Sequence, residues 1–294
     1  MSLLKHMEDN PTSSNKAITP DIITYTSVLI LQGKVNPQRA ADIAYSYLER
    51  AIASNEKVQI DRFGFQQLLK ALSRSNKLQH AMMARKAWEW IENSDKANIL
   101  DSDLCNLVLL SYSKANIAKT AEKALSFLTE RISRYKDGDS TTILPTMVGF
   151  GSILSSLGNA NRVDDALRLV EIMKVLNKDG VPSVEPDEGC YTTILRALAH
   201  SEADSAAPQA LWVVKRMKED FGTIPSTALN AAIHVCSRTS PRRAKNKSIE
   251  AAFDIFQLGK ESDCRDAVTY GLMIRTCINQ TDDDETRFKL VQVS

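Results

Sequence analysis

Apolar residues recur along this chain at the spacing of one face of a helix, in segments that resemble one another. The segment PDEGCYTTILRALAHS, residues 186–201, carries Tyr191, Ile194, Leu195 and Leu198 at positions i, i+3, i+4 and i+7. Related segments begin at Pro20, Asp61, Asp101, Met147, Ser226 and Asp266. A pattern that recurs at a regular interval predicts a tandem repeat in place of a single globular core.

The copies share one register. Aligned on the residue that follows the aromatic position, they place Thr26, Gln66, Asn106, Gly151, Thr192, Asn230 and Gly271 together. The successive spacings are 40, 40, 45, 41, 38 and 41 residues, and an apolar pair follows two and three residues later in each copy. The register predicts first helices of seven units that begin near residues 22, 62, 102, 147, 188, 226 and 267, with the last unit incomplete.

A second helical pattern lies between the copies. After Asn36 and Pro37, which suit a helix cap and a first helical residue, comes QRAADIAYSYLERAI. Further segments of this kind begin at Gln79, Ala118, Asp164, Pro208, Ile249 and Asp282. Alanines near the start of six of these segments favour close packing between helices: Ala41, Ala87, Ala124, Ala166, Ala210 and Ala252.

The two patterns predict an all-α chain of helix–turn–helix units, because no segment alternates as a strand would. One hairpin cannot bury its apolar face alone, so the units would stack into a superhelical α-solenoid with a concave groove. We expect residues 20–294 to form this solenoid. Residues 1–19 are polar and rich in Ser, Asn and Thr, which predicts a flexible lead-in.

Composition removes several classes of function. Lys and Arg number 37 against 36 Asp and Glu, so net charge alone indicates no polyanionic partner. The five cysteines form no C-x-x-C pair and the four histidines lack metal-ligand spacing, so we expect buried thiols, no metal and no cofactor. No apolar run approaches the ~20 residues of a membrane span. No Gly-rich phosphate loop or nucleophile elbow appears, and we expect no enzyme activity.

The residues 1–19 have neither the apolar core of a signal peptide nor the Arg-rich character of a transit peptide. Either the protein is not imported into an organelle, or the chain is a fragment. The last unit ends at Ser294 inside its second helix, which favours a fragment.

The segments ITPDIITYTSVLI, EPDEGCYTTILRAL, RDAVTYGLMIRTCIN and DALRLVEIM resemble the pentatricopeptide repeat, over roughly residues 20–294. The period here is longer than that of the family. The W-x-x-L-G-x-x-Y pattern of tetratricopeptide repeats, the main alternative, is absent. The resemblance implies a right-handed superhelical solenoid, a monomer, that binds single-stranded RNA with about one base per repeat. It further implies a role in RNA processing, stability or translation in a mitochondrion or plastid.

The resemblance also implies base-reading positions, at which a polar residue would act with a partner from the start of the next unit. These pairs are Thr26 with Asp61, Gln66 with Asp101, Asn106 with Thr146, Thr192 with Pro225 and Asn230 with Asp266. The first resembles a pair that prefers guanine and the last one that prefers uracil, whereas the others depart from the family's pairs or leave the base unclear. The code is therefore degenerate. The base wedges would be Ile23, Phe63, Val148 and Val268. Helix capping is the structural alternative for these Thr, Asn and Asp residues.

A further stripe lies at the thirteenth position of each unit, where Lys34, Arg74, Lys114, Asn159, His200, Arg238 and Asn279 stand and no residue is acidic. Lys70, Arg196 and Arg275, one turn earlier, would widen it. Because equivalent positions line up in a solenoid, we predict a phosphate track with the acids on the outer helices. The track comprises Lys34, Arg74, Lys114, Arg196, His200, Arg238 and Arg275. The alternative is that basic residues at a helix C-terminus only offset the helix dipole.

Two charged segments have simpler interpretations. We expect Arg242, Arg243, Lys245 and Lys247 to lie in a solvated loop, and the acids from Asp282 to Glu285 to start a helix. Two other functions stay open: a protein–protein interaction scaffold that uses the same concave face, and a structural subunit of an organelle ribonucleoprotein. Positive potential in the groove would favour RNA, whereas apolar or mixed patches there would favour protein partners.

Overall fold

A computed structural model describes residues 21–53, 60–115, 118–181, 184–201, 203–238 and 241–280. The predicted lead-in and the predicted helix from Asp282 lie outside these residues. Over the described ranges the chain forms thirteen α-helices and one short 3₁₀ helix and no strand, which confirms the all-α class. The chain divides into two compact units: the first holds residues up to 115 together with 123–145, and the second holds 116–122 and residues from 146 onward.

Seven first helices begin at the residues where the repeat register places them. They are α2 (Ile22–Val35), α4 (Arg62–Leu72), α6 (Ser102–Lys114), α8 (Met147–Asn159), α10 (Glu188–Leu198), α12 (Ser226–Arg238) and α14 (Ala267–Gln280). Five of them start after an aspartate whose carboxylate accepts the N–H of the third following residue at 2.7–3.2 Å. These caps satisfy backbone N–H groups that the first helical turn leaves without a partner. This explains why an acid recurs at the start of the hairpins.

Six second helices alternate with the first helices. They are α3 (Pro37–Ala53), α5 (Leu78–Glu92), α7 (Ala118–Lys136), α9 (Val163–Lys178), α11 (Ala206–Phe221) and α13 (Pro241–Glu261), and a 3₁₀ turn, Ala97–Ile99, follows α5. The six recurring alanines, from Ala41 to Ala252, are all 0% exposed, as close helix packing requires.

One local prediction is wrong. The basic segment with Arg242, Arg243, Lys245 and Lys247 forms the first turns of α13 and not a loop. Proline at the first helical position needs no N–H partner, and Arg, Ala and Lys are good helix formers. The helix-forming tendency of these residues therefore decides the structure of the segment, although its charge is typical of a loop.

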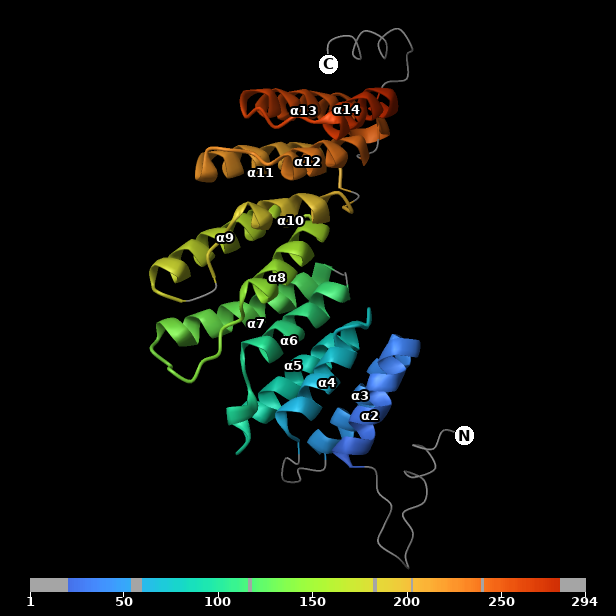
Figure 1. The fold of residues 1–294 in the computed structure, drawn as a ribbon, viewed down its shortest axis with the longest axis vertical. Coiled ribbons are helices and arrows are strands. Elements are labelled where there is room, and N and C mark those ends of the chain that lie inside the picture. Colours follow the sequence, from blue (N-terminus) through green and yellow to red (C-terminus); the bar gives the residue numbers. More distant parts are fainter. Residues whose placement is uncertain are drawn as a thin grey trace, which may run out of the picture. The chain divides into compact units, whose positions relative to one another are not determined.

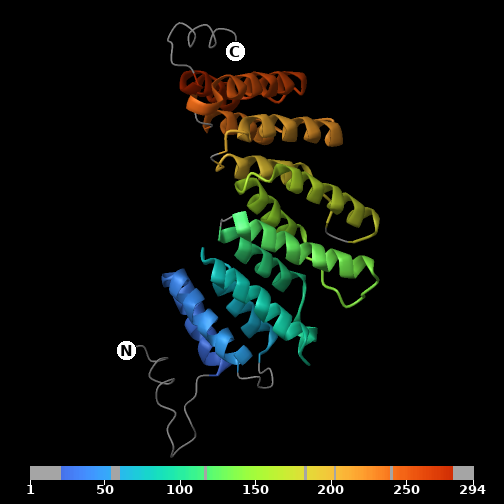
Figure 2. The same cartoon turned by 180° about the vertical axis from the view of Figure 1, so that it is seen from behind.

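Contacts within each unit follow one rule. The first helices α2, α4, α8, α10 and α12 each pack on the second helix of their own hairpin and on the next first helix. In the first unit the first helices α2, α4 and α6 succeed one another, and α3 packs on α5. In the second unit the series are α8, α10, α12, α14 and α9, α11, α13. Figures 1 and 2 show the helices of the second unit in chain order from both sides. Each unit is therefore a repeat-like arrangement with one layer of first helices and one of second helices.

The aromatic residue of the repeated segment joins the two helices of a hairpin. The rings of Tyr25 and Tyr47 have centroids 4.5 Å apart, and Arg50 donates to the Tyr25 hydroxyl at 2.7 Å. In the second unit, Tyr191 lies edge-on to Phe221 with centroids 5.9 Å apart. The aromatic position is buried in the first six copies, whereas Tyr270 in the last copy is 40% exposed.

The five cysteines are free, and four of them are buried, as expected. Burial raises the pKa of the Cys105 and Cys236 thiols to about 12, which keeps both protonated at neutral pH. No group of His, Cys, Asp and Glu suited to a metal ion occurs among the described residues. None of the described helices is long and apolar enough to cross a membrane.

Candidate nucleic-acid interface

The base-reading positions occupy the fifth residue of each first helix, but they differ in exposure. Thr26, Asn106 and Thr192 are 6%, 6% and 7% exposed. The hydroxyls of Thr26 and Thr192 donate to the backbone oxygens of their own helices at 3.0 and 2.9 Å. Such back-bonding is common for threonine within helices and engages the only donor of the side chain. Gln66 and Asn230 are more open.

Asn230 is held by residues at the start of the next helical hairpin. Its side-chain Nδ2 lies 3.2 Å from both carboxylate oxygens of Asp266, and its Oδ1 accepts a hydrogen bond from the Thr269 hydroxyl at 2.7 Å. Asp266 also accepts the Thr269 N–H at 2.8 Å, and these hydrogen bonds lower the pKa of the Asp266 carboxyl. The amide of Asn230 is thus fixed in orientation and keeps hydrogen-bonding capacity for a ligand.

Two of the other predicted pairs are not joined in this way. No hydrogen bond links Thr26 to Asp61, or Gln66 to Asp101, in the described structure. Asp61 caps α4, and Asp101 caps α6 while also accepting Arg62 Nε at 2.6 Å. Capping, the structural alternative for these aspartates, is their visible role.

The predicted base wedges are exposed apolar side chains. Ile23, Phe63, Val148 and Val268 each occupy the second residue of a first helix and are 70%, 53%, 64% and 58% exposed. A single exposed aliphatic residue needs no explanation, but recurrence at one register position marks a shared surface. These side chains are free to contact a base in the way the wedge requires.

The predicted phosphate track is exposed throughout. Six of its members make no hydrogen bond or ion pair with any described residue: Lys34, Lys114, Arg196, His200, Arg238 and Arg275. The seventh, Arg74, donates from Nη1 to the backbone oxygen of Gly33 at 3.0 Å. Arg74 therefore interacts with the C-terminal end of a helix, which is the structural alternative to a phosphate contact.

Acidic residues are segregated between the two layers of helices. The seven described first helices contain no Asp or Glu beyond their first turn. Acids lie on every second helix: Asp42, Glu49, Glu89, Glu92, Glu122, Glu130, Asp164, Asp165, Glu171, Glu219, Asp220, Glu250, Asp254 and Glu261. The acids are thus where the sequence pattern placed them, on the layer opposite the phosphate track.

Ion pairs connect successive second helices. In the first unit Arg85 pairs with Glu130 at 2.9 Å, between α5 and α7. In the second unit Lys218 pairs with Glu261 at 2.6 Å, between α11 and α13. These two bonded cations contrast with the unpaired cations of the track, whose charge remains available to an external anion.

A hollow of about 370 Å³ opens on the first-helix layer of the second unit. Its walls come from α10, α12 and α14, and it is lined by Arg196, Ala199, His200, Thr227, Asn230, Ala231, His234 and Leu272. Two track residues and one base-reading residue therefore share one site. Sequence analysis missed His234, although Asn230, His234 and Arg238 recur every four residues and so share a helix face. No acidic side chain lines the hollow.

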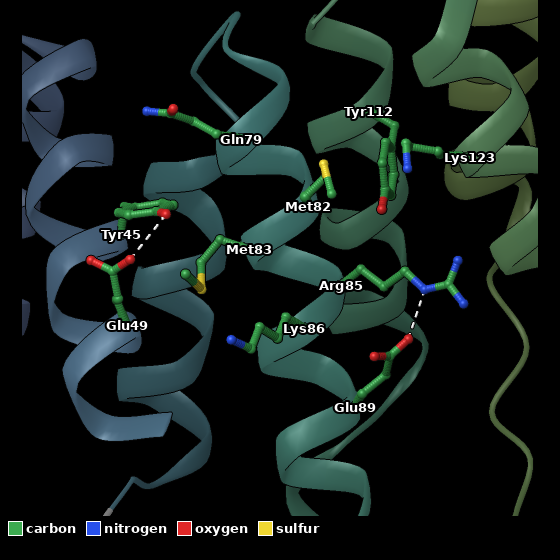
Figure 3. A pocket seen from close by; sticks show the side chains of 10 residues that line it. All are labelled: Tyr45, Glu49, Gln79, Met82, Met83, Arg85, Lys86, Glu89, Tyr112 and Lys123. Atoms are coloured by element: carbon green, nitrogen blue, oxygen red, sulfur yellow. Dashed lines mark hydrogen bonds and ion pairs between the residues drawn. The ribbon is translucent and has the colours of Figure 1, made fainter. Parts of the chain in front are cut away.

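A second cleft, of about 550 Å³, lies in the first unit on the second-helix layer. Figure 3 shows Tyr45 and Glu49 on one wall, α5 residues such as Met82 along the middle, and Tyr112 and Lys123 on the other wall. Tyr45 donates to Glu49 at 3.2 Å, and Arg85 binds Glu89 at 2.7 Å. The lining is mixed in charge and polarity: Arg85 and Glu89 form an ion pair, whereas Lys86 and Lys123 make none with a described residue.

Ser75, His80 and Asp42 meet within the first unit. His80 Nδ1 lies 2.7 Å from Ser75 Oγ, and Nε2 lies 3.3 Å from Asp42 Oδ1. The serine is only 1% exposed, and its Oγ already accepts the Lys77 N–H at 3.1 Å. A buried hydroxyl engaged in this way ties α3 to α5 and offers no accessible nucleophile.

Comparison with known proteins adds no family assignment. No protein-family model matches the sequence, and no curated protein matches it.

Proposed function

We propose that this protein binds single-stranded RNA along its first-helix layer, as a pentatricopeptide-like α-solenoid, and acts on organelle transcripts in processing, stability or translation. The observation that carries the proposal is the set of unpaired cations on first helices that lack acids. Exposed, unpaired cations recur at one register position on helices that carry no acid beyond the first turn. A surface of this kind attracts a polyanion although the chain as a whole is nearly neutral.

The two ends of each first helix would contact different parts of an RNA strand. The exposed apolar residues near the helix starts, such as Phe63, would pack against base faces, which every base presents. The cations near the helix ends, such as Lys114 and Arg238, would contact phosphates. Sequence preference would come chiefly from Asn230, which is oriented by Asp266, and from Gln66. We therefore expect strong, salt-sensitive binding with weak base preference.

The decisive experiment compares two sets of charge removals in the same unit. The test variant combines Arg196→Gln, Arg238→Gln and Arg275→Gln. The control combines Lys178→Gln, Lys215→Gln and Lys260→Gln, which removes three exposed, unpaired charges from second helices. Binding of a random-sequence RNA pool is measured over a range of salt concentrations.

The test variant should lose RNA affinity, and the slope of log K against log salt should become shallower by about 2, at ~0.7 per lost phosphate contact. The RNA affinity of the control variant and its dependence on salt should stay close to those of the wild type. Equal losses in both variants, or no RNA retained by the wild type at low salt, would refute the proposal.

The cleft of Figure 3 supports a second function, binding of a protein partner. Its mixed lining of tyrosines, methionines and charges of both signs suits a peptide better than a polyanion. Met82 is 46% exposed at its centre. A Met82→Glu variant that abolished capture of a protein partner and left RNA binding unchanged would favour this scaffold function, including membership of an organelle ribonucleoprotein.

A further inference from the structure

His234 is placed differently from the other described histidines. It stands on α12 in the wall of the hollow, half-buried, between Asn230 and Arg238 on the same helix face. Arg196 on α10 and His200, two residues after the end of α10, line the same hollow, and α14 closes it with Leu272. The imidazole is therefore open to a ligand in the hollow yet partly shielded from water.

The charged groups that act on His234 are all basic. Burial lowers the pKa of His234 most, and the nearby Arg238, Arg275 and His200 lower it further. They come from α12 itself, from α14 and from the segment just after α10. The remaining neighbours of α12 are α11 and α13, and neither contributes a charged group to the surroundings of this imidazole. Burial and these cations together favour the neutral form of the His234 imidazole.

A bound phosphodiester would reverse that balance. It carries one negative charge that does not titrate near neutral pH, and its oxygens accept hydrogen bonds. A neutral imidazole offers one N–H donor, whereas the imidazolium offers two and a positive charge. An anion beside His234 therefore stabilises the protonated form, and by linkage protonation strengthens binding of the anion.

We propose that the hollow between α10, α12 and α14 is a proton-coupled phosphodiester site, in which His234 takes up one proton from solvent when an RNA phosphate binds beside Arg196, Arg238 and Arg275. The inference rests on the proposed function, because it assigns a phosphate of the bound RNA to this hollow. RNA affinity then depends on pH as well as on salt. It rises as the pH falls, because protons are taken up on binding.

The first test measures binding of a 12-nucleotide oligouridylate at constant ionic strength between pH 8.0 and 5.5, a range in which uracil does not titrate. Uptake of one proton gives up to a tenfold rise in affinity per pH unit, so wild-type affinity should rise about tenfold over this range. The His234→Gln variant keeps an N–H donor but cannot be charged, so its RNA affinity should change less than about twofold over the same pH range. His6→Gln is the control for loss of an imidazole and should retain the wild-type rise.

The second test uses sulfate, a permanent dianion, and follows the imidazole nitrogens of the labelled protein by NMR. Sulfate should raise the pKa of His234 and leave that of the buried His80 unchanged. Oligouridylate binding that is independent of pH, with no effect of sulfate on His234, overturns this inference and leaves the RNA proposal intact. Absence of oligouridylate binding, with sulfate still raising the His234 pKa, supports the anion site and refutes the RNA proposal.

Discussion

Arg74 completes the end of the first helix of the preceding hairpin by donating a hydrogen bond to the Gly33 carbonyl at 3.0 Å. In a helix this oxygen would accept the N–H four residues on, but that residue is Pro37, which has none. The same arrangement recurs where Asn279 donates to the Ser237 carbonyl at 3.4 Å, four residues before Pro241. A proline at the start of a second helix is thus compensated by the thirteenth residue of the next hairpin.

Replacing Arg74 by alanine should destabilise the first unit by about 0.5–1 kcal/mol, because a partly solvated carbonyl loses its only side-chain donor. Lys114→Ala, at the equivalent position but without such a bond, should stay within about 0.5 kcal/mol of wild type. Urea unfolding measures both. Equal destabilisation would mean that the Arg74 bond contributes nothing.

Glu92→Gln should be strongly destabilising. The Arg131 side chain is 2% exposed, binds Glu92 at 2.8 Å, and has its guanidinium carbon 4.8 Å from the Trp88 ring centroid. Removing the carboxylate leaves a buried cation without its counter-charge, which costs about 3 kcal/mol. Glu130→Gln, whose ion pair with Arg85 is largely exposed, should cost less than about 1 kcal/mol. Similar urea midpoints for the two variants would contradict this account.

Stability should rise with pH between about 5.5 and 7.5, partly through His80. Burial, the largest influence, lowers the pKa of His80, and Lys77 lowers it further against the opposing charge of Asp42. Above the unfolded pKa of about 6.5 the neutral imidazole is stable in both states. As the pH falls below that value, the unfolded chain binds a proton that the folded chain does not, so stability is lost.

His80→Gln should therefore flatten the pH dependence of the free energy of unfolding, measured by urea denaturation at several pH values. The pKa of His234 is also lowered, so His234→Gln should further reduce the pH dependence of the free energy of unfolding. If His80→Gln left the slope unchanged, the buried imidazole would not be the titrating group.

Phe63→Ala should weaken RNA binding with little effect on stability. The ring is 53% exposed at the second residue of α4, so its loss leaves no cavity. Loss of one base-stacking contact costs about 1–3 kcal/mol of binding. Val35→Ala is the control. It truncates a 75% exposed side chain at the last residue of α2 and should leave RNA affinity unchanged. A gel-shift titration distinguishes the two.

Asp266→Ala should change which RNA is preferred, whereas Asp187→Ala should not. Both variants lose a helix cap, so both should lower the urea midpoint by similar amounts. Only Asp266 also orients Asn230. Sequencing of RNA selected from a random pool by each variant gives the answer, and identical preferences for the two would exclude a base-reading role for this pair.

Helix positions were accessible from the sequence because two local signals agree. Capping aspartates such as Asp61 and apolar residues at helical spacing mark the same starting residues, and alanines such as Ala87 mark the closest helix contacts. Neither signal depends on distant parts of the chain. The basic start of α13 was missed because charge was given more weight than the helix-forming tendency of the segment.

Exposure at the candidate site could not be predicted in the same way. Thr26 and Gln66 occupy the same position of their helices, but how far each side chain reaches solvent depends on its length and on the residues that pack around it. The partner of Arg74 is 41 residues away and depends on how two hairpins stack. His234 could have been found, since its spacing from Asn230 and Arg238 places it on their helix face.

The track cations stand on helices that have no acid beyond the first turn, a local excess of positive charge that the near-zero net charge of the chain conceals. No acid of the same helices offsets the attraction of these cations for a polyanion. Isoelectric point and ion-exchange behaviour would therefore understate the affinity of this protein for an anionic strand.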